Sequence, residues 1–160
     1  MKKILLSANA AALLAAIALM TSCGAGSGSG SGANSGGVPS GKTIASGPAG
    51  NNLTATISSA EGAYGASTDG SLRTGQQEFM LTFTDASGKP VDVGAVALNN
   101  HMAAMGSMGA MNDNAKLTTT VTPGVFKGKV NIDMAGEWQA QITYEGPAGK
   151  GSFSLPIVAK

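Results

Sequence analysis

The sequence predicts an all-β protein with an immunoglobulin-like β-sandwich of about seven strands, and three observations carry this prediction. Between about residue 51 and residue 160, short segments alternate apolar and polar residues with the two-residue period of a strand. Turn-forming Gly, Pro and Asp residues separate these segments at short intervals. No segment after residue 23 keeps a helical periodicity, and about seven strands in roughly 110 residues are typical of a sandwich.

Each expected strand is recognised by apolar side chains that share one of its faces. One row is Phe79, Leu81 and Phe83, and a second row begins at Trp138. The turn DASGKP at residues 85–90 combines an Asp that bonds the local backbone with a permissive Gly and a Pro. The expected strands, in order, are 53–58, 77–84, 91–98, 116–121, 125–134, 138–145 and 153–157.

We interpret residues 1–22 as a lipoprotein signal peptide. Two lysines give a positive start, and an apolar stretch rich in Ala and Leu follows them. The sequence MTSC then resembles a lipobox, so Cys23 is the expected site of cleavage and lipidation. Residues 23–50 would hold the lipidated Cys and a flexible Gly/Ser linker, because so little apolar surface does not offset the entropy of ordering the chain. Residues 51–160 then form one domain.

Composition and charge argue against several classes of function. Cys23 is the only cysteine, so the chain has no internal disulfide. Without the signal peptide, eight basic and nine acidic side chains give a net charge of −1, with no Lys/Arg cluster to bind nucleic acid. His101 is the only histidine, no cysteine accompanies it and the carboxylates are scattered, so we expect no catalysis.

The segment HMAAMGSMGAM carries the strongest indication of function. It places one imidazole among four thioethers: His101, Met102, Met105, Met108 and Met111. Soft sulfur ligands and imidazole select Cu(I), and thioethers suit an oxidising compartment because they form no disulfides. Met134, in the strand expected over residues 125–134, is a further candidate ligand.

The methionines have two other interpretations. They are adaptable core fillers that would close one end of a core poor in aromatic residues, or they form a surface that repacks against a partner protein. Their three-residue spacing matches neither a strand nor a helix and favours a loop, with room for a short strand near His101. A Gly-rich loop would let several thioethers converge near the imidazole, so we favour the Cu(I) site.

From residue 72 onward the chain resembles the YtkA-like family, a group of small exported or lipid-anchored domains with FixH-like relatives. The resemblance rests on LRTGQQEFMLTFTDASGKPVDVGAV, on the Met-rich HMAAMGSM and on PGVFKGKVNIDMAGEW. It implies an immunoglobulin-like sandwich and a role in metal handling at the cell envelope, because such domains occur with copper export systems and oxidase assembly. Related loops often carry a second histidine after Met-Gly, whereas here Ser107 follows Gly106.

These features predict a lipid-anchored domain at a bacterial membrane, facing the periplasm or the exterior, with the outer membrane as one location. We expect it to bind Cu(I) through the Met/His loop. Its expected partners are the membrane, through the lipid at Cys23, and a copper-transport or oxidase-assembly protein. The alternative is a structural or protein-interaction lipoprotein without metal, in which the Met-rich loop is core or partner contact.

Overall fold

The computed structural model describes residues 41–60 and 69–160, and β-strands are the regular secondary structure in these ranges. The strands are β1 (Thr43–Gly50), β2 (Leu53–Ser59), β3 (Gly75–Thr84), β4 (Ala95–Met102), β5 (Met111–Asn114), β6 (Lys116–Thr119), β7 (Val125–Ile132), β8 (Gly136–Gly146) and β9 (Gly149–Ala159). In these ranges, no helix has the length and apolar character that a membrane crossing requires. The predicted signal peptide, Cys23 and the linker up to residue 40 lie outside the described residues.

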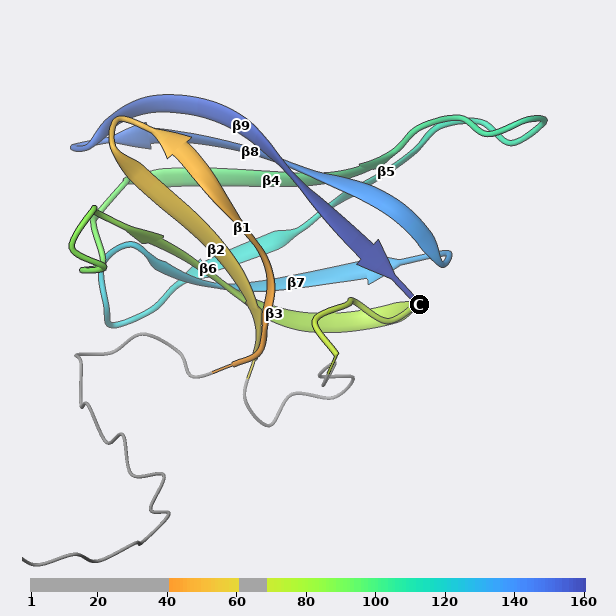
Figure 1. Ribbon diagram of the computed structural model, residues 1–160, viewed down its shortest axis with the longest axis horizontal. Coiled ribbons are helices and arrows are strands. Elements are labelled where there is room, and N and C mark those ends of the chain that lie inside the picture. Colours follow the sequence, from red (N-terminus) through yellow and green to blue (C-terminus); the bar gives the residue numbers. More distant parts are fainter. Residues whose placement is uncertain (1–40, 61–68) are drawn as a thin grey trace, which may run out of the picture. The chain divides into compact units, whose positions relative to one another are not determined.

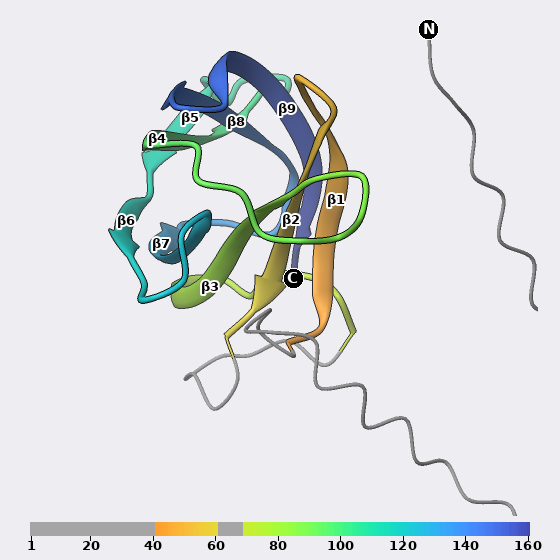
Figure 2. The ribbon, with the colours of Figure 1, turned by 90° about the vertical axis from the view of Figure 1, so that its left-hand side faces the viewer.

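The strands form two antiparallel sheets that face each other. One sheet has the order β1-β2-β3-β7-β6 and the other has the order β5-β4-β8-β9. Figure 2 shows the two layers, and Figure 1 shows their strands from the side. The order β2-β3-β7-β6 opposite β5-β4-β8-β9 corresponds to A-B-E-D opposite C′-C-F-G of an immunoglobulin domain. The predicted all-β, immunoglobulin-like sandwich is therefore confirmed.

Strand β1 corrects the predicted linker. Residues 43–50 were expected to be flexible, but they pair with β2 along their whole length. Ala45 and Ala49 are buried, and Gly47 lies so close to β9 that a Cβ there would be 2.8 Å from Leu155 Cδ2. The small residues that resembled a linker therefore allow close packing between the two sheets.

The strand expected over residues 116–121 is shorter than predicted. Strand β6 ends at Thr119, and Val121 beyond it is fully exposed. The hydroxyl of Thr120 donates to Val125 O at 2.9 Å and closes a turn into β7. A single apolar residue after the strand therefore belongs to this turn.

The apolar rows predicted from the sequence meet in the core. Phe79 and Phe83 of β3 are at most 2% exposed, and Trp138 of β8 is buried to the same degree. Phe83 makes edge-to-face contacts within its own sheet, to Phe126 at 6.2 Å, and across to the other sheet, to Tyr144 at 5.4 Å between ring centroids. These contacts pack the two sheets against each other near the start of β4, where Tyr144 lies opposite Val96.

Candidate metal centre

The Met-rich segment forms a β-hairpin rather than the expected loop. Strands β4 and β5 pair up to Met102 and Met111, and Met105 and Met108 then exchange two backbone hydrogen bonds of 3.1 and 2.9 Å. Gly106 opens the two-residue turn between them, where its φ of 58° suits glycine. Figure 1 shows this hairpin projecting beyond the two sheets.

A symmetry in the sequence explains this pairing. Met105 and Met108 stand at equal distances from the centre of the turn, and so do Met102 and Met111. Pairing across a hairpin depends on distance from the turn, so a three-residue spacing within one strand does not prevent it. The expectation of a loop considered only the period within one strand and missed this signal.

The base of the hairpin holds methionines that belong to the core. Met102 is 3% exposed, and a Cβ at Gly136 would lie 2.8 Å from its Cε. Met111 and Met134 are partly buried against the same core cluster, and the carbonyl of Met134 accepts the indole N–H of Trp138 at 3.1 Å. The interpretation of the methionines as core fillers therefore describes Met102 well.

The tip of the hairpin holds two methionines that are open to solvent. Met105 is 54% exposed and Met108 is 39% exposed. Because they form a hydrogen-bonded cross-strand pair, their side chains share one face and their Cα atoms lie about 5.5 Å apart. Two flexible thioethers at that separation can turn toward one point without any change in the backbone.

His101 lies on the outer face of the sheet, with one ring nitrogen already engaged. Its Nδ1 is 3.0 Å from Oδ1 of Asn112, its cross-strand neighbour on β5. Because an amide oxygen only accepts, Nδ1 donates this bond and Nε2 of the neutral ring keeps its lone pair. Asn99 supports the arrangement by donating to the same Asn112 oxygen at 3.2 Å. Metal-bound histidines usually donate their second ring N–H to such a partner, so this arrangement suits a ligand role.

The six predicted ligands lie in three places. Met102, Met111 and Met134 gather at the core end of the hairpin, whereas Met105 and Met108 are paired at its tip. His101 precedes Met102 in β4, so its ring points to the opposite face of the sheet. The sequence did not indicate Asn99 and Asn112, because their contribution to the His101 site depends on the cross-strand register.

The described residues contain no metal site built from carboxylate, histidine and cysteine side chains. No group of three or more His, Cys, Asp or Glu side chains there is placed to hold a metal ion. Methionine is not one of these four residue types, so this finding does not apply to a site formed by the methionine pairs.

Comparison with known proteins gives one match. A family model for YtkA-like proteins matches residues 51–143, which is more than half of the chain. No curated protein and no solved structure matches it. The matched range starts before β2 and runs into β8, so it contains the whole β4–β5 hairpin. The chain belongs to the YtkA-like family.

Proposed function

We propose that this protein is a lipid-anchored, extracytoplasmic domain that binds Cu(I) at the tip of the β4–β5 hairpin. The lipid would be attached at Cys23, and the bound copper would pass to or from a copper-transport or oxidase-assembly protein. Membership of the YtkA-like family supports a role in metal handling at the cell envelope. We expect no catalysis from the domain itself.

The single observation that carries this proposal is the exposed cross-strand pair of Met105 and Met108. Cu(I) prefers soft sulfur ligands and accepts low coordination numbers, so two thioethers on one face of a ribbon provide a starting site. Thioethers carry no proton to lose, and such a site would work over a wide pH range. A partner protein could reach ligands at the end of a projecting hairpin, which suits metal transfer.

His101 and the methionines at the hairpin base have secondary roles in this proposal. The free Nε2 of His101 is the nearest nitrogen ligand along the hairpin, although Met105 lies four positions farther along the chain. That separation corresponds to about 13 Å along a strand, so His101 would join the site only through bending of the tip. Met102, Met111 and Met134 would support the hairpin and supply further thioethers at its foot.

A competition titration of Cu(I) against a chromogenic chelator tests the proposal. The double variant Met105→Leu/Met108→Leu keeps apolar side chains of similar size and removes both thioethers. We expect it to weaken Cu(I) binding by about tenfold or more. Met80→Leu, a change of the same kind in β3, serves as the control and should bind as the wild type does.

Two outcomes would contradict the proposal. Wild-type affinity in the double variant would move the site away from the tip, and absence of Cu(I) binding in the wild type would remove it altogether. The second outcome would favour the alternative function, a contact surface for another protein, because exposed methionines also adapt to varied partners. That alternative predicts loss of partner binding in the double variant without any dependence on copper.

A further inference from the structure

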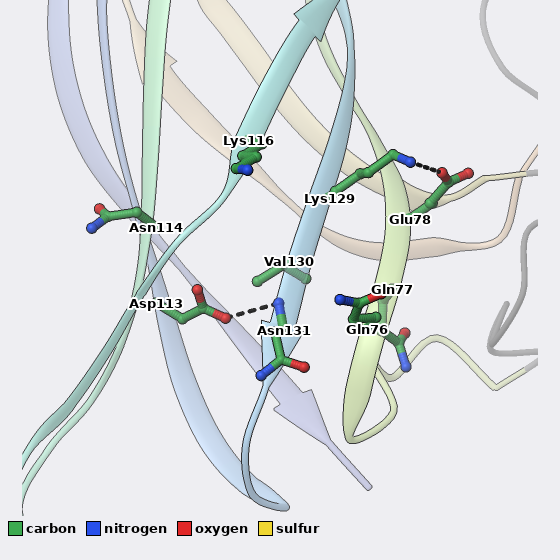
Figure 3. Close-up of a pocket in the computed structure, with 9 residues that line it drawn as sticks. All are labelled: Gln76, Gln77, Glu78, Asp113, Asn114, Lys116, Lys129, Val130 and Asn131. Carbon is green, nitrogen blue, oxygen red and sulfur yellow. Dashed lines mark hydrogen bonds and ion pairs between the residues drawn. The ribbon is translucent and has the colours of Figure 1, made fainter.

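A second candidate site lies in a cavity of about 400 Å³ beside the crossover from β5 to β6. Figure 3 shows its lining, which comes from the start of β3, the end of β7 and residues 113–116 of the crossover. Strand β6 pairs with β7 only as far as Lys116 and Lys129, and β7 continues to Ile132. The cavity occupies this gap at the sheet edge, and its volume is in the range of small-molecule sites.

Gln77 puts an amide at a position where the strand alternation predicts an apolar side chain. It shares a face of β3 with Phe79, lies opposite Val130 of β7 and is only 6% exposed. Its amide forms no hydrogen bond to another described residue, but the buried polar atoms without a partner in these ranges belong to Asn99 and Asn100, so the Gln77 amide reaches the solvent in the cavity. Figure 3 shows the amide pointing from β3 toward β7 and the cavity. An amide that faces an open cavity can exchange its water for a polar group of a ligand, so Gln77 is available to a polar occupant.

Two opposite charges line the cavity without neutralising each other. Asp113 accepts the backbone N–H of Asn131 through Oδ2 at 2.8 Å, and its Oδ1 has no bond to any described residue. Lys116 forms no ion pair within the same part of the chain. The remaining carboxylate, Glu78, is already bound by two lysines of β7 at 2.8 and 2.9 Å. The cavity therefore presents one carboxylate and one ammonium without ion-pair partners among the described residues. It also presents the buried residue Gln77 and three further amide side chains, those of Gln76, Asn114 and Asn131.

We propose that this cavity binds a small zwitterion of the size of a free amino acid or a dipeptide. Asp113 would receive its ammonium group, Lys116 its carboxylate and Gln77 its remaining polar group. A bare cation would find too few oxygen ligands, since no group of three or more His, Cys, Asp or Glu side chains is placed to hold a metal in the described ranges. An anion would be repelled by Asp113, and an apolar molecule would leave all three groups unsatisfied.

Calorimetric titration of the purified protein with glycylglycine tests this site. We expect saturable binding that is lost with N-acetylglycine, which lacks the ammonium, and with glycinamide, which lacks the carboxylate. The variants Asp113→Asn and Lys116→Gln should each weaken binding by about tenfold. Asp113→Asn keeps an oxygen for the Asn131 N–H and so preserves the local fold.

Matched controls make the same charge changes outside the cavity: Asp92→Asn and Lys150→Gln should bind glycylglycine as the wild type does. Absence of saturable binding up to about 10 mM would overturn the proposal. Equal binding of the two single-charge analogues, or wild-type affinity in both cavity variants, would overturn it as well. Thermal melting confirms that each variant is folded. If Asp113→Asn is unstable, the binding affinity of Lys116→Gln for glycylglycine tests the proposal alone. The outcome is independent of copper binding at the hairpin.

Discussion

The base and the tip of the β4–β5 hairpin carry the same pairing of methionines in opposite environments. At the base, Met102 is 3% exposed and packs against Gly136, opposite Met111. At the tip, Met105 and Met108 are 54% and 39% exposed and have no core beneath them. The side chains are chemically identical, so the difference comes from their positions in the hairpin. A three-residue step along a strand turns Met105 to the face opposite that of Met102, and the tip lies farther from the two sheets. These positions decide whether the rest of the sandwich covers a given pair.

The comparison teaches that the Met-rich motif is not a single functional unit. A buried thioether contributes packing energy, and exposing it would cost stability. An exposed thioether contributes little to stability and is free to bind a metal or a partner. The same motif can therefore anchor the hairpin at one end and present ligands at the other.

The largest contrast should appear in stability when single methionines are truncated. Met102→Ala removes a fully buried side chain and should lower the free energy of unfolding by about 2–5 kcal/mol. Met105→Ala changes an exposed side chain and should stay within about 0.5 kcal/mol of the wild type. Urea unfolding followed by tryptophan fluorescence measures both, since Trp138 lies in the core. Equal losses would show that the base and the tip do not differ in packing.

A second contrast should appear in the rates of methionine oxidation. Hydrogen peroxide transfers one oxygen atom to a thioether, which gives a sulfoxide and water, and access of the oxidant limits the rate. Met105 and Met108 should be oxidised several times faster than Met102 in the native protein. Peptide mass spectrometry after timed exposure measures each site. In concentrated urea the rates should become equal, and equal rates without urea would contradict the assignment of Met102 to the core.

Sequence patterns predicted the sandwich better than they predicted the candidate site. Alternating rows such as Phe79 to Phe83 report burial directly, because one face of a strand is apolar when it meets a core. Strand β1 was missed because close packing at Gly47 requires small residues, and small residues are also typical of linkers. The sequence did not separate the methionines of the tip from those of the base. That separation depends on which residues pair across the turn, and the spacing of residues within one strand does not report it. The same limit applies to Asn112, whose oxygen reaches His101 only through that register.

The smallest expected effect is on the pH dependence of stability, and it comes from two turns of different construction: the turn at the hairpin tip and the turn after β3. The tip turn is closed by the two backbone bonds between Met105 and Met108. In the other turn, Asp85 Oδ1 accepts the hydroxyl of Ser87 at 2.6 Å, its N–H at 2.8 Å and the N–H of Lys89 at 3.1 Å. The hydrogen bond from the Ser87 hydroxyl, followed by that from the Lys89 backbone, lowers the pKa of Asp85 below its ordinary value.

A lowered carboxylate pKa makes the stability of the Asp85 turn depend on pH, and the tip turn has no such group. The folded state binds the proton more weakly than the unfolded state, so this contribution is present above the ordinary pKa of Asp, about 4, and is lost as the pH falls through the lower folded pKa. We expect Asp85→Asn, which keeps an accepting oxygen but does not ionise, to flatten the fall in melting temperature between about pH 4 and pH 2. Gly106→Ala at the tip should lower the melting temperature equally at both pH values, because its φ of 58° is strained without a titrating group. A wild-type acid profile in Asp85→Asn would show that other carboxylates carry the pH dependence, among them Glu78, whose pKa is lowered by hydrogen bonds from Lys127 and then Lys129.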